Sequence, residues 1–231
     1  MSLAGHKPAK ELPTKETMVS LYCRSMVIQL LAGKFLHRIE TLRRLAINSE
    51  VLASRSRANG RAISAIAKEL QTITQKMTAI QDRLASDSSQ LATYALVSTA
   101  KARQCEKYQM VLKSGISGKN RALIESTRNR MGCVLISELE KLRRQLEMTQ
   151  GTMLDLTRVS IHIPMVATFF KIEAASCQAH METTFRNIAD QLVTLNDRLA
   201  LEIEDVVAKV KGALAIFDST EGPVEEDSLS A

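Results

Sequence analysis

The sequence predicts an all-α protein, an elongated antiparallel four-helix coiled-coil bundle made of two long helical hairpins. Apolar residues recur in alternating steps of four and three over tens of residues, without a slip from Leu135 to Met181. Between Pro13 and Pro223 the chain contains a single proline, Pro164. A stripe that repeats every 3.5 residues covers one side of a helix and needs partner helices to bury it.

Turn signals divide the chain into two hairpins. Residues 1–13 are expected to be disordered, and residues 14–217 to form the bundle. The first hairpin covers residues 14–113 and turns at Asn59-Gly60, because this dipeptide favours turns. A Ser- and Gly-rich loop at 114–120 leads to the second hairpin, residues 121–217, in which we expect Pro164 to kink a continuous helix. Residues 218–231, with five acids and no Lys or Arg, are expected to form a disordered acidic tail.

Composition limits the class and location of the protein. Aromatic residues make up only 3% and Trp is absent, as a thin bundle filled by aliphatic side chains allows. The N-terminus lacks the apolar stretch of a signal peptide, and no apolar run approaches the roughly 20 residues that span a bilayer. We therefore expect a cytoplasmic protein.

The charge balance leaves a second function open. The chain has 31 basic and 25 acidic residues, so without the five acids of the tail its helical body is more basic still. A basic body can attract nucleic acid or anionic lipid. The basic residues alternate with acids, however, and no aromatic and basic platform is present, so we favour a solvated helix surface.

Signals for an enzyme are nearly absent. The four histidines are scattered, and none follows a Glu by three residues, as a di-iron bundle requires. The four cysteines are far apart and do not form the close pairs of a disulfide framework or zinc module. No Gly-rich phosphate loop or nucleophile motif occurs. We therefore expect no catalytic residue, no cofactor, no metal and no small-molecule substrate.

One segment resembles a known family. Residues 45–74 read LAINSEVLASRSRANGRAISAIAKELQTIT, which is similar to the membrane-distal hairpin tip of methyl-accepting chemotaxis receptors. The match needs no gap, and the positions that conform are Leu45, Ala46, Asn48, Ala53, Arg55, Gly60, Arg61, Ala67 and Glu69. The chain differs from the family at Leu52, Arg57, Ala58, Ile63, Leu70 and Gln71.

The resemblance implies both an architecture and a binding site. The family's cytoplasmic signalling domain is a long hairpin that dimerises into four helices, and its tip binds a histidine kinase and a coupling protein. Two hairpins in one chain would supply four helices, with both tips at one end and the 114–120 loop at the other. The residues that the resemblance implies for partner binding, around the turn at Gly60, are Arg55, Asn59, Arg61 and Glu69.

The sequence therefore predicts a non-enzymatic cytoplasmic module for signal transduction or scaffolding. Its partners would be proteins, with a chemotaxis-type histidine kinase or coupling protein as candidates, bound at the hairpin tip. The alternative is a basic helical bundle that binds a polyanionic surface, lipid or nucleic acid. Self-association is left open.

Overall fold

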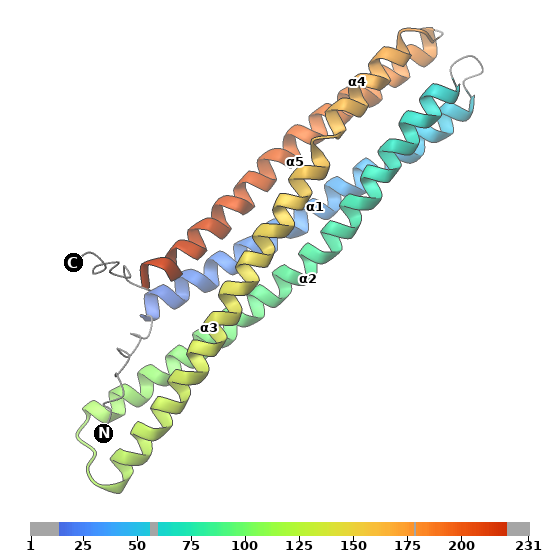
Figure 1. The fold of residues 1–231 in the computed structure, drawn as a ribbon. Coiled ribbons are helices and arrows are strands. Elements are labelled where there is room, and N and C mark those ends of the chain that lie inside the picture. Colours follow the sequence, from blue (N-terminus) through green and yellow to red (C-terminus); the bar gives the residue numbers. More distant parts are fainter. Residues whose placement is uncertain (1–13, 56–59, 178, 221–231) are drawn as a thin grey trace, which may run out of the picture.

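A computed structural model describes residues 14–55, 60–177 and 179–220, and the regular structure in these ranges is helical (Figure 1). The helices are α1 (Lys15–Arg55), α2 (Gly60–Lys113), α3 (Lys119–Ser160), α4 (Ile163–Ala174) and α5 (Ala179–Thr220). Since α4 continues the course of α3, the two together form the third arm of a four-helix bundle. The predicted fold class is confirmed. The last helix, α5, reaches Thr220, three residues beyond the expected end of the bundle.

The arms follow one another around the bundle in chain order. The arm α1 packs on α2 and α5, and α3 also packs on α2 and α5, while α4 packs on α5 and α2. The end of α1, the start of α2, the end of α4 and the start of α5 lie together at one end of the molecule (Figure 1). The loop between α2 and α3 lies at the opposite end, as the two-hairpin architecture predicts.

The predicted stripes form the core. Phe35, Leu70 and Leu146 are fully buried, and so are the small residues Ala46 and Ala53 near the end of α1. The core also contains one aromatic pair, in which the rings of Phe170 and Phe185 stack with centroids 6.1 Å apart. Burial of such side chains is the main favourable term in folding.

The third arm is interrupted just before Pro164, where we expected only a kink. Instead of a kinked continuous helix, α3 ends at Ser160 and α4 begins at Ile163, with Pro164 in its first turn. Proline has no N–H to donate, and its ring would clash with the carbonyl of Ser160 four residues earlier. The first turn of a new helix tolerates both defects. Ile161 and His162 keep right-handed helical angles, so the arm continues in the same general direction.

The helices α2 and α3 extend past the start of α1 and the end of α5. The hydroxyl of Thr99 on α2 donates to the carbonyl of Met18, 3.3 Å away, near the start of α1. Arg143 on α3 bonds Asp218 near the end of α5 (3.2 Å). Past these two contacts, α2 and α3 continue as a pair of helices toward the loop that joins them (Figure 1). We call this pair, residues 100–140, the hairpin extension. Its loop turns through Gly115 (φ 88°) and Gly118 (φ 71°), backbone angles that favour glycine.

Candidate interaction surfaces

The predicted tip residues lie on both sides of the first turn. Arg55 is the last residue of α1 and Gly60 the first of α2, whereas Asn59 lies outside the described residues. Arg61 and Glu69 are both exposed on α2. Eight residues separate them, which is about 12 Å along a helix at 1.5 Å per residue. The structure thus places Arg61 beside the turn and Glu69 more than two helical turns away from it.

An apolar surface near the same end was not predicted from the sequence. It consists of four exposed side chains, spaced by four, four and three residues, which we call the α4 outer face: Ile161 (63% exposed), Met165 (45%), Phe169 (45%) and Ile172 (60%). Such spacing places side chains on one side of a helix.

This surface lies opposite the face that packs into the bundle. The core residues of α4 include Val166, Ala167 and Phe170, which are buried. The helix α4 is thus apolar on two opposite sides, and its outer side is uncovered in the single chain. The apolar residues Phe169 and Ile172 do not belong to the predicted stripe. Their presence in the sequence could have predicted this second apolar side.

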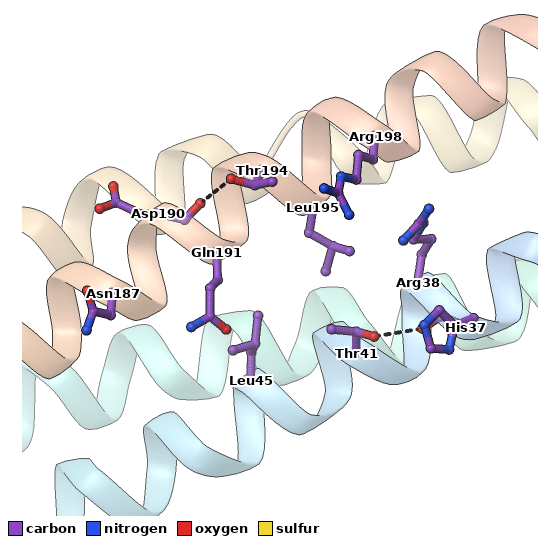
Figure 2. A pocket seen from close by; sticks show the side chains of 10 residues that line it. All are labelled: His37, Arg38, Thr41, Leu45, Asn187, Asp190, Gln191, Thr194, Leu195 and Arg198. Atoms are coloured by element: carbon purple, nitrogen blue, oxygen red, sulfur yellow. Dashed lines mark hydrogen bonds between the residues drawn. The ribbon is translucent and has the colours of Figure 1, made fainter.

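A groove with a volume of ≈ 490 Å³ lies between α1 and α5 (Figure 2). The hydroxyls of Thr41 and Thr194 donate to backbone carbonyls of their own helices, both at 2.9 Å. Arg38 bonds Glu202 with N–O distances of 3.2 and 3.0 Å. His37 is the only imidazole in the lining, and no Ser, Cys or Lys lines the groove with it. The groove walls therefore consist mainly of groups that already serve helix structure and helix–helix contact.

A buried polar cluster lies between α2 and α3. Asp87 is only 5% exposed, and its carboxylate accepts hydrogen bonds from Gln145 Nε2 (3.1 Å) and Thr152 Oγ1 (3.0 Å). Gln145 and Thr152 are buried as well. Asp87 follows Leu84 by three residues and precedes Leu91 by four, so it occupies a position in the stripe. That spacing was the signal that could have predicted its burial.

Within the described ranges, no group of three or more His, Cys, Asp or Glu side chains could hold a metal ion. Contrary to the expectation from its apolar runs, the chain has one helical segment, Lys15–Ser54, that is long and apolar enough to cross a membrane by length and composition. A core helix of a soluble protein passes the same test, and 33% of the most apolar window of this segment is buried in the bundle. The predicted cytoplasmic location therefore stays a prediction.

Comparisons with protein-family models, curated proteins and solved structures give no match for this chain. The resemblance of residues 45–74 to chemotaxis receptors therefore stays a prediction as well.

Proposed function

We propose that this protein is a non-enzymatic signalling or scaffold module that binds a partner protein near the end of the bundle where both hairpins turn. The observation that carries this proposal is the uncovered α4 outer face. It occupies the last turns before the chain reverses into α5, at the end where α1 and α2 also meet (Figure 1).

The chemistry of the α4 outer face favours a protein over a charged ligand. The nearest cations already face carboxylates, since Lys171 lies 2.7 Å from Asp190 and Arg158 lies 3.4 Å from Asp155. What remains exposed is aliphatic, aromatic and thioether surface. Contiguous apolar patches of this kind on a soluble protein are typical of interaction sites, and Phe and Met are enriched in protein interfaces.

The shape of this surface suits a helical segment of the partner. From Ile161 to Ile172 the stripe is about 16 Å long at 1.5 Å per residue. An amphipathic helix could lay its apolar face along this stripe, as helices commonly do against apolar surfaces. Arg61, exposed on α2 close to the turn, could add directed hydrogen bonds to the same partner, a role for which the planar guanidinium group is well suited.

The test compares two matched double variants in pull-downs from the source cell. Phe169→Ser with Ile172→Ser removes the centre of the α4 outer face. Leu36→Ser with Leu201→Ser removes equally exposed side chains (56% and 66%) on α1 and α5. We expect the first variant to lose proteins that the wild type and the second variant retain. Circular dichroism should show the same helix content for all three proteins.

Three further outcomes of the pull-down would identify the partner or contradict the proposal. If a chemotaxis-type histidine kinase or coupling protein is among the lost proteins, and Arg55→Ala with Arg61→Ala also weakens it, the resemblance of the tip extends to function. If the wild type forms a dimer that the α4 variant does not form, the partner is a second copy. Identical proteins captured at identical levels by all variants would overturn the proposal.

A further inference from the structure

The distal end of the hairpin extension carries an unbalanced positive charge. Residues 107–124 contain Lys107, Lys113, Lys119 and Arg121 and no Asp or Glu. All four cationic side chains are exposed. Only Arg121 has a described ion pair, with Glu125 one turn further along α3 (3.0 Å). Residues 51–68 are likewise free of Asp and Glu, so charge alone does not distinguish this end from the rest of the bundle.

Exposed apolar side chains lie among these cations. Leu123 is 67% exposed and Met110 is 56% exposed, while Ile116 is half-buried in the loop. On α2, Lys107 and Met110 are one turn apart, and on α3, Lys119 and Leu123 are one turn apart. Residues three or four apart share a helix face, so each helix presents one cation and one apolar side chain side by side.

We propose that this distal end docks on an anionic lipid surface. Lys107, Lys113 and Lys119 would bind phosphate and carboxylate groups of the headgroups. Leu123 and Met110 would enter the boundary between headgroups and acyl chains. Basic residues combined with exposed apolar residues are the pattern by which peripheral segments bind membranes.

The same residues fit nucleic acid less well. Proteins that bind single strands stack bases on aromatic side chains, and the only aromatic residue in 100–140 is Tyr108, which is half-buried. Binding to the phosphate backbone of a duplex uses cations and hydrogen-bond donors, which leaves the exposure of Leu123 and Met110 without a role. A lipid boundary uses both kinds of side chain.

The fold makes this end accessible. The core of buried apolar residues stops at Ala95 on α2 and resumes at Leu142 on α3, so the extension lies outside the four-helix region. Its loop is at the opposite end of the molecule from α4 (Figure 1). Lipid docking therefore does not depend on the protein binding proposed above, and both surfaces could be occupied together.

Vesicle co-sedimentation with the full chain tests the proposal. We expect binding to vesicles of phosphatidylcholine with 30% phosphatidylserine, and little binding to phosphatidylcholine alone. Each Lys or Arg near such a surface contributes roughly a fivefold change in partitioning, so Lys113→Gln with Lys119→Gln should weaken binding by about 25-fold. Leu123→Ser should weaken it further, because the apolar contact is lost. Salt should weaken it too, by screening.

Matched controls separate this site from a general effect of charge or apolar surface. Lys68→Gln with Lys76→Gln removes two exposed lysines of α2 nearer the other end, and Leu201→Ser removes an equally exposed leucine (66%) of α5. Both controls should bind like the wild type. The proposal would be overturned by equal binding to neutral and anionic vesicles, by absence of binding to both, or by equal losses in variants and controls. Tighter binding to a labelled RNA or DNA duplex, lost in Lys113→Gln with Lys119→Gln, would instead assign the site to nucleic acid.

Discussion

Asp87 places a carboxylate in the contact between α2 and α3, where the neighbouring stripe positions hold Leu84 and Leu91. Burying an ionised group is costly unless hydrogen bonds replace its water, and Gln145 and Thr152 supply two of them. A shift of α3 by one turn would leave the carboxylate without these donors. Polar groups in a coiled-coil seam can specify register in this way, and we assign that role to Asp87.

Replacement of Asp87 by Ala should lower the free energy of unfolding by about 1–3 kcal/mol, since the buried donors of Gln145 and Thr152 would lose their acceptor. Asp82→Ala, on an exposed face of the same helix, is the matched control and should change stability by no more than about 0.5 kcal/mol. Urea unfolding followed by circular dichroism measures both. Equal effects of the two substitutions would contradict the register role.

The cysteines offer a second prediction at the residue scale. Burial raises the pKa of the Cys105 thiol, against the opposing effect of the nearby Arg128 guanidinium. Because the thiolate is the reactive form, Cys105 should react slowly at neutral pH and faster as the pH rises. Cys23 and Cys133 are exposed and should react first with a thiol reagent. Mass spectrometry of partly labelled protein gives the order, and early labelling of Cys105 would show that the extension opens readily.

At the scale of helices, the periodic stripes predicted the arms because burial of an apolar face is what holds long helices together. The stripe from Leu135 to Met181 correctly placed Leu142, Leu146 and Phe170 in the core. The stripe phase could not show where a helix extends beyond the other helices of the bundle. The apolar spacing is the same whether the stripe faces one helix or three. For the same reason the outer face of α4 was missed: a search for one stripe does not detect a second one on the opposite side.

Local chemistry decides two features that the stripe phase alone does not predict. The effect of Pro164 depends on whether the flanking residues can start a new helix, which the stripe phase does not report. The hydrogen-bond donors of Asp87 are 58 and 65 residues away in sequence, so its place in the stripe predicts burial but not these partners. The resemblance at residues 45–74 implies partner binding at Arg55, Asn59, Arg61 and Glu69. This binding stays a prediction.

The hairpin extension should be the least stable part of the described bundle. Beyond Thr99 few of its described side chains are buried, among them Cys105 and Leu135, and they lie outside the main core cluster. Local opening requires less free energy where few apolar contacts are lost. Hydrogen exchange followed by mass spectrometry should therefore show faster exchange in residues 100–130 than in residues 66–84 of α2. Equal protection along α2 would mean that another contact, such as a second copy, covers the extension.

At the scale of the whole molecule, the two surfaces proposed for binding lie at opposite ends of a rod. One end joins two hairpin turns to the apolar outer face of α4, and the other presents cations around a glycine-containing loop (Figure 1). A long bundle holds such ends far apart, since the rise per residue of a helix sets its length. This arrangement suits a module that holds a partner protein at a distance from a surface.

The length of this rod can be measured directly. The longest helix, α2, has 54 residues, which is about 80 Å at 1.5 Å per residue. A uniform rod of that length and ~10 Å radius has a radius of gyration of about 24 Å, whereas a compact domain of 231 residues would have about 17 Å. Small-angle scattering should give the larger value, together with a maximum dimension of at least ~80 Å. Light scattering on the same sample gives the mass, because a side-by-side pair would double the mass while changing the length little. A radius of gyration near 17 Å at monomer mass would show that the arms fold back on themselves in solution, and the separation of the two proposed binding ends would then be lost.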